Sequence, residues 1–127
     1  MSLSLSNFLI CFTLLCASLA SAEVVVYNFT ASWITANPDG QLERPVIGIN
    51  GKWPIPRIEA NLGDRIVVEL KNDLGNQSTS IHFHGLFQNG TSHMDGAVGA
   101  TQCGIPPGAT FVYDFVVSRR EIMKPTS

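Results

Sequence analysis

The chain has 127 residues, a length typical of a single domain. Ten acidic and eight basic side chains give a formal net charge of −2 at pH 7. A charge this close to zero argues against nucleic acid or an anionic membrane surface as a partner.

The first apolar segment, residues 8–20, has no charged side chain and leads into Ala20-Ser21-Ala22. The segment is short for a bilayer span, and small-x-small is the pattern that signal peptidase cleaves. We therefore predict a signal peptide at residues 1–22, which directs the chain to the secretory pathway, either secreted or at the cell surface. A retained membrane anchor is the alternative. No second apolar segment follows, so we predict no transmembrane segment after the signal.

Removal of the signal would change the cysteine count. Cys11 and Cys16 leave with it, and Cys103 stays. One unpaired cysteine in an exported protein indicates either a free thiol or a bonding partner elsewhere.

Three N-x-[ST] triplets follow the predicted signal, beginning at Asn28, Asn76 and Asn89. Three such triplets in a secreted chain favour glycosylation at the surface. Asn28 is the least typical acceptor because it lies inside a predicted strand.

Short runs of β-branched and apolar residues, separated by turn residues, make up the chain from Glu23 onward. In one run Ile66, Val68 and Leu70 alternate with polar or charged residues, which is typical of a half-buried strand. No helical periodicity of useful length appears after the signal, so the pattern predicts an all-β sandwich or barrel. The aromatic side chains, Tyr113 among them, are interpreted as packing residues. The predicted strands cover residues 24–29, 44–50, 65–71, 79–85 and 110–117.

Two histidines lie one residue apart in the fourth predicted strand. Strand alternation puts His82 and His84 on one face and Phe83 on the other, with the histidine Cβ atoms about 6.6 Å apart. Such a pair can chelate one metal ion or hold one ion each of a cluster, and the spacing permits both. Imidazole suits copper, zinc, iron and nickel alike. The alternative is an ordinary solvated strand, because two ligands do not complete a metal site.

The wider run from Thr79 to Gly108, TSIHFHGLFQNGTSHMDGAVGATQCGIPPG, resembles the first copper motif of multicopper oxidases. In that family an H-x-H-G strand precedes a D-G pair, a T-Q-C triplet and a P-G turn. HFHGLFQNG with MDG looks most like the fungal iron-oxidising, iron-uptake branch, whereas laccases more usually carry tryptophan between the histidines. The upstream run RPVIGINGKWPIPRIEANLGDRIVVEL is similar to the family's first strands. The resemblance covers roughly residues 23–117 and implies a cupredoxin-like Greek-key β-sandwich.

The resemblance also implies copper as the cofactor and a role for each matching residue. His82 would bind the type 2 copper and His84 one type 3 copper of a trinuclear cluster. Asp95 matches an acid that assists proton delivery to oxygen without binding copper, although an aspartate before a glycine is also an ordinary turn residue. Cys103 matches a cysteine that forms a disulfide with a distant domain. His93 matches no ligand position and is predicted to be a surface residue.

The family function would be oxidation of a one-electron donor, Fe(II) or a phenol, with reduction of O2 to water. An iron permease is an implied partner. The family's second H-x-H run and its type 1 copper ligands have no match, so we expect the sandwich to be incomplete at its C-terminal end. We also expect this chain alone to be inactive as an enzyme and to bind copper weakly.

Residues 118–127 resemble nothing in the family. Val117-Ser118 can be encoded by GTAAGT, the consensus start of an intron, so we hypothesise that this tail is translated intron. Two alternatives stay open for the chain as a whole. One is a non-catalytic secreted β-sandwich that binds copper or a partner protein, and the other is an unfolded degradation product.

Overall fold

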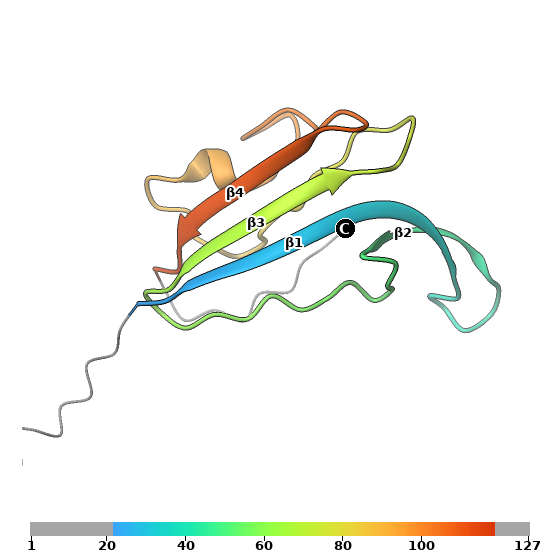
Figure 1. Ribbon diagram of the computed structural model, residues 1–127, viewed down its shortest axis with the longest axis horizontal. Helices are drawn as coiled ribbons and strands as arrows, with labels where there is room; N and C mark the ends of the chain where they lie inside the picture. The colour runs from blue at the N-terminus through green and yellow to red at the C-terminus, as the bar shows by residue number, and fades with distance from the viewer. Residues whose placement is uncertain (1–21, 119–127) are drawn as a thin grey trace, which may run out of the picture.

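The computed structural model describes residues 22–118, and Figure 1 shows them as a sheet with irregular segments around it. The predicted signal peptide lies outside the described residues except for Ala22, and so does the tail from residue 119 onward. Four strands form one sheet in the order β2-β1-β3-β4. β1 pairs with β2 antiparallel and with β3 parallel, and β4 pairs with β3 antiparallel. The strands are β1 (Val24–Ala36), β2 (Arg44–Ile49), β3 (Arg65–Asn72) and β4 (Thr110–Val116).

Four of the five predicted strands are confirmed, with small differences at their ends. β1 is the exception in length, because it continues from residue 29 to Ala36. The additional residues pair with β2, in a register that sets Ala31 opposite Ile49 and Ala36 opposite Arg44. The sequence pattern did not reveal this extension, since Ser32, Thr35 and their neighbours lack a strong apolar alternation.

The fifth predicted strand, residues 79–85, is wrong as a sheet element. Thr79 forms an isolated bridge with Ile105, and the chain turns at His84 and Gly85. The amide of Ile81 donates to the side chain of Tyr113 instead of to a neighbouring strand. Period-two alternation indicates which side chains share a face, and it does not require a backbone ladder.

The core lies on one face of the sheet, which we call the inner face. Ile66, Val68 and Leu70 of β3 are fully buried there, beside Tyr113 and Phe115 of β4. Burying side chains of this size stabilises the fold by about 1.5–3 kcal/mol each. The inner face is covered by residues from outside the sheet, namely Ile58, Ile81, Phe83 and Ile105.

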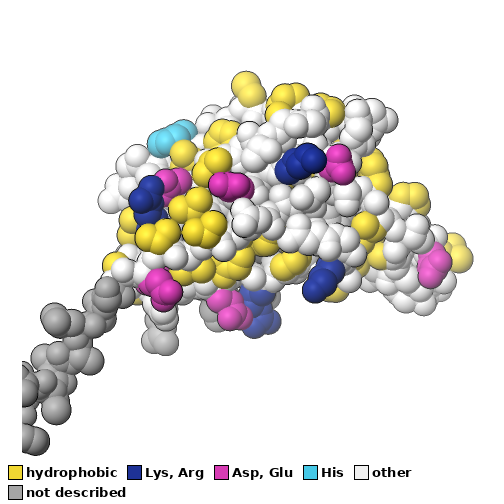
Figure 2. All heavy atoms as spheres, in the orientation of Figure 1, with side chains coloured by type: hydrophobic (Ala, Val, Ile, Leu, Met, Phe, Trp, Pro, Cys, Tyr) yellow, Lys and Arg dark blue, Asp and Glu magenta, His cyan; other side chains and the backbone are white. Residues whose placement is uncertain are grey.

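The opposite, outer face carries exposed valines together with an ion pair. Arg65 donates from Nε to one carboxylate oxygen of Asp114 at 2.7 Å, and from Nη2 to the other at 2.5 Å. This pairing lowers the pKa of Asp114 and raises the pKa of Arg65. Figure 2 shows the resulting mixture of hydrophobic and charged side chains on the face in view. The exposed valines are Val24, Val26, Val112 and Val116.

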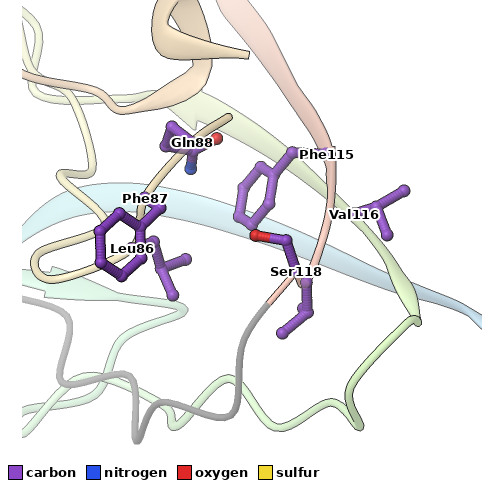
Figure 3. A pocket seen from close by; sticks show the side chains of 7 residues that line it. Leu86, Phe87, Gln88, Phe115, Val116 and Ser118 are labelled. Atoms are coloured by element: carbon purple, nitrogen blue, oxygen red, sulfur yellow. The ribbon is translucent and has the colours of Figure 1, made fainter. Parts of the chain in front are cut away.

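Hollows in the described part of the chain lie against the sheet. A cavity of about 80 Å³ opens over the inner face between Ala31, Leu70 and Ile81. A smaller one, of about 10 Å³, lies between the loop at Gln88 and the end of β4 (Figure 3). Its volume suits one water molecule. In residues 22–118 one four-stranded sheet is present, where a complete sandwich has two.

Helical structure in the described part of the chain amounts to one short turn, the 3₁₀ helix η1 (Ser92–Met94). Residues 22–118 therefore include no helix long and apolar enough to cross a membrane.

Candidate metal centre

The candidate centre is built on the irregular segment 79–85, which crosses the inner face of the sheet. Thr79 exchanges two backbone hydrogen bonds with Ile105, at 3.1 and 2.8 Å. Further along, the Ile81 amide donates to the hydroxyl oxygen of the fully buried Tyr113 at 3.1 Å. Phe83 inserts into the core, with its ring centroid 5.2 Å from that of Tyr113. The buried Phe83 fixes which way its two neighbours point.

The side chains of His82 and His84 lie together on the side away from Phe83. Their ring centroids are 5.4 Å apart, and the ring planes meet at 89°. The His82 side chain is 34% exposed, and His84 is exposed. A ligand or another segment can therefore reach both imidazoles. Their position on one side of the segment agrees with the shared face expected from the sequence.

One nitrogen of His82 is already engaged. Its Nδ1 lies 2.9 Å from the carbonyl oxygen of Asp95, so Nδ1 carries the proton and donates it to that carbonyl. The other nitrogen, Nε2, is then the one with a free lone pair. In metal sites a ligating histidine usually binds the metal through one ring nitrogen and donates the N–H of the other to a carbonyl or carboxylate oxygen.

Asp95 contributes its backbone and its carboxylate to different contacts. Its carbonyl oxygen also accepts from the Phe83 amide at 3.0 Å, so it fixes the histidine segment at two points. The carboxylate Oδ2 lies 3.4 Å from His82 Nδ1, and the side chain is 20% exposed. The carboxylate forms no bond to the amides of its own turn in the described residues. The turn-aspartate interpretation therefore explains the backbone of Asp95 but not its side chain.

Gly96 brings this turn close to the histidines. Its φ is +82°, and a Cβ placed there would lie 1.7 Å from the carbonyl oxygen of Ile81 and 3.1 Å from the Cα of His82. Only glycine fits this contact. Ser80 adds a bond from its hydroxyl to the Gly96 carbonyl at 2.8 Å. The D-G pair of the motif is thus a close backbone contact with the histidine segment.

The other predicted functional residues lie apart from the pair. His93 is exposed on η1, as expected of a surface residue, and Cys103 is exposed as a free thiol. The side chains of Asn28, Asn76 and Asn89 are all exposed, and Asn28 lies within β1.

Two imidazoles fit copper as part of a site. Their donor type is one that copper prefers, and one free nitrogen is already oriented by the carbonyl bond to His82. In the described range, 22–118, no three histidine, cysteine, aspartate or glutamate side chains are grouped so that they could hold an ion. The remaining ligands of a complete centre would have to come from outside this range.

Sequence reasoning missed three residues that shape the site. Tyr113 was interpreted as packing alone, and Ser80 and Gly96 were seen only as parts of the motif. Their contacts join segments far apart in the chain, and periodicity reports only on near neighbours. The close approach at Gly96 had a signal in the D-G pair of the motif.

Comparison with known proteins decides the family. The family model described as Multicopper oxidase matches residues 30–122. The chain belongs to the multicopper oxidase family. It is 65% identical over 101 residues to the iron transport multicopper oxidase fetC of Epichloe festucae, covering 80% of this chain and 16% of that protein. It is 52% identical over 100 residues to FET3 of Saccharomyces cerevisiae, covering 79% of this chain and 16% of that protein.

Solved multicopper oxidases share the fold. The crystal structure of Fet3p, a multicopper oxidase that functions in iron import, matches with a TM-score of 0.71 and 50% identity. That match covers 76% of this chain and 18% of the other. The laccase of Botrytis aclada matches with a TM-score of 0.72 and 38% identity, over 77% of this chain and 18% of the laccase. The fold is all-β and cupredoxin-like, copper is the metal that this family binds, and the chain spans about a sixth of the length of these curated relatives.

Proposed function

We propose that this chain is the N-terminal part of a secreted or cell-surface multicopper oxidase and supplies the first two histidines of its copper centre. His82 would bind the type 2 copper through Nε2, and His84 would bind one type 3 copper. The observation that carries this proposal is the bond from His82 Nδ1 to the Asp95 carbonyl, which leaves Nε2 free beside the neighbouring imidazole. Bound copper would supply the redox chemistry for reducing O2 to water.

The acid of the D-G pair has a separate role in this proposal. Reduction of O2 to water consumes protons, and a carboxylate near the cluster can relay them. Asp95 is suited to this because its carboxylate lies beside His82 and is not used to hold its own turn. Copper would be bound by the imidazoles, while Asp95 would hold and pass protons without ligating the metal.

The reducing substrate of the complete oxidase would be Fe(II), with a phenol as the second candidate. The relatives named iron transport multicopper oxidases favour Fe(II), and the laccase neighbours favour a phenol. An iron permease would be the matching partner of the Fe(II) enzyme. The route would be secretory, with residues 1–22 as signal peptide and residues 23–117 as the partial cupredoxin domain. Residues 118–127 would be an unrelated tail, although the match to the family model runs on to residue 122.

Two surface features belong to the same proposal. Asn76, Asn89 and Asn28 would carry glycans, and their exposure leaves room for them. Cys103 would form a disulfide with another domain, and its thiol is exposed.

The histidine pair can be tested by copper titration of the full chain, expressed through a eukaryotic secretory pathway. We expect Cu(II) binding with a nitrogen-ligand signal in electron paramagnetic resonance. His82→Ala and His84→Ala should each weaken binding by about tenfold or more. His93→Ala is the matched control, because His93 is exposed on η1, and it should leave binding unchanged. Equal losses in all three variants would contradict the proposed site.

The same preparation distinguishes the second candidate, a non-catalytic copper-binding β-sandwich. That candidate is favoured by the absence of a third ligand near the pair in residues 22–118. Both candidates expect copper binding without turnover by this chain alone. An Fe(II) and phenol oxidase assay of a longer protein that includes this sequence would separate them, since only the oxidase fragment gains activity.

A further inference from the structure

We infer that Tyr113 is a positioning residue that sets the geometry of the histidine pair through its hydroxyl oxygen, an inference that rests on the proposed copper site. Tyr113 is central in the core, with a side chain that is fully buried on the inner face of β4. Its hydroxyl oxygen accepts the Ile81 amide at 3.1 Å, one residue before His82.

The bond matters because segment 79–85 belongs to none of the four strands of the described sheet. In a sheet, the backbone amides would be held by a regular ladder, and the position of each side chain would follow from it. Here the Ile81 amide is buried, and its acceptor is the tyrosine hydroxyl and not a carbonyl of a neighbouring strand. A buried amide without an acceptor is costly, so loss of the hydroxyl should shift the segment.

The ring of Tyr113 acts on the next residues of the same segment. Its centroid is 5.2 Å from that of Phe83 in an edge-to-face contact, and Phe83 separates the two histidines in sequence. Tyr113 therefore contacts the segment on both sides of His82, by a hydrogen bond before it and by an aromatic contact after it. The two contacts fix the backbone that carries the imidazoles.

The hydroxyl of Ser80 joins the histidine segment to the D-G turn. It donates to the carbonyl of Gly96 at 2.8 Å and so holds the D-G turn against the segment. The His82 Nδ1 bond to Asp95 depends on that turn staying in place. Tyr113 thus joins the sheet to the histidine segment, and Ser80 joins that segment to the D-G turn.

The test compares two substitutions that remove the same atom from the same residue type. Tyr113→Phe removes the acceptor of Ile81. Tyr27→Phe removes a hydroxyl that bonds to the Glu59 amide and carbonyl, both at 2.9 Å, and Tyr27 takes no part in the histidine segment. If Tyr113 only stabilises the fold, both variants should affect the copper site equally. If it positions the site, only Tyr113→Phe should do so.

Copper affinity, the copper hyperfine pattern and nitrogen-15 shifts of the two imidazoles in the metal-free chain are the measurements. We expect Tyr113→Phe to weaken Cu(II) binding by about tenfold, which is the smaller effect seen when a residue that orients a metal ligand is replaced. It should also shift the nitrogen-15 signals of both histidines. Tyr27→Phe should change affinity less than twofold and leave those signals in place. Ser80→Ala should act like Tyr113→Phe, and Ser80→Thr should restore the wild-type values.

The metal-free shifts separate this inference from the proposed function. If the wild-type chain does not bind copper at the histidines, the copper site fails, and the shifts still decide the role of Tyr113. If Tyr113→Phe and Tyr27→Phe leave the imidazole shifts alike, the inference is overturned, whatever the copper titration shows.

Discussion

Two aspartates next to glycines, Asp64 and Asp95, show how the same pair of residue types serves different purposes. Asp64 is buried, and its carboxylate accepts the Glu23 amide at 2.9 Å and the Asn61 amide at 2.7 Å. At Asp95 the backbone carbonyl accepts the structural hydrogen bond from His82, and the carboxylate lies beside the same imidazole. The Asp64 carboxylate is occupied by structural hydrogen bonds, whereas the Asp95 carboxylate remains available to take part in chemistry. The difference between the two aspartates is whether backbone amides donate to the carboxylate.

The glycines of the two pairs differ in the same way, and their substitution is expected to have the largest effect. Both have positive φ, +91° at Gly63 and +82° at Gly96. A Cβ at Gly63 would meet nothing within 4 Å, whereas one at Gly96 would lie 1.7 Å from the Ile81 carbonyl oxygen. Gly63→Ala should cost about 1–2 kcal/mol of left-handed strain. Gly96→Ala adds an overpacking cost of about 1–3 kcal/mol, for roughly 2–5 in all.

Urea unfolding of the two alanine variants measures this difference, and Cu(II) titration measures its effect on the site. Gly96→Ala should lose copper binding together with stability, while Gly63→Ala should keep the affinity of the wild type. Equal unfolding free energies for the two variants would mean that the histidine segment moves aside for a Cβ at position 96 at little cost. That result would contradict the expected overpacking.

The sheet was the part of the fold that the sequence predicted best. In β3 the buried Ile66, Val68 and Leu70 alternate with exposed or half-buried residues, and this pattern depends only on neighbours two positions apart. The parallel pairing of β1 with β3 could not be predicted in that way, because register between distant strands has no local signal. The strand expected at residues 79–85 failed for the same reason. Its alternation was correct, but within residues 22–118 the segment pairs with no strand of the sheet.

The site was predictable only in its residue types. The motif gave His82, His84 and Asp95 as candidates, which stay a proposal, and the alternation rule placed the two imidazoles on one side. The bonds that orient them come from Tyr113, Ser80 and the Asp95 carbonyl, and each joins residues at least thirteen positions apart. Such bonds arise from the tertiary fold, so a sequence pattern cannot specify them.

Part of the acid dependence of stability should come from Asp64. The amides of Glu23 and Asn61 lower the pKa of Asp64 below its ordinary value in the folded chain. A carboxyl group with a lowered folded pKa stabilises the protein above its unfolded pKa of about 3.9 and loses that contribution as the pH falls through the folded value. Asp64→Asn should therefore lower stability at neutral pH and flatten its decline below about pH 4.

Urea unfolding between pH 2.5 and 7 measures this dependence. Asp114 contributes a slope of the same sign, because Arg65 lowers its pKa, so Asp64→Asn should flatten the profile without abolishing the decline. An Asp64→Asn profile parallel to that of the wild type would show that its two amide bonds do not depend on the charge.

The smallest effect on stability is expected at Asp95, whose substitution separates the two roles most directly. Asp95→Asn keeps the backbone carbonyl that accepts His82 Nδ1 and the Phe83 amide, so the segment should stay in place. Within the described residues the carboxylate accepts no amide, and stability should change by less than about 0.5 kcal/mol. The change should appear instead in the nitrogen-15 shifts of His82, whose Nδ1 lies 3.4 Å from the lost carboxylate oxygen, with a smaller effect on His84. A loss of stability as large as that of Asp64→Asn would make Asp95 a structural turn residue. An unmoved His82 signal would show that the carboxylate does not influence the proposed metal ligand, and this would remove the basis for a role of Asp95 in proton delivery.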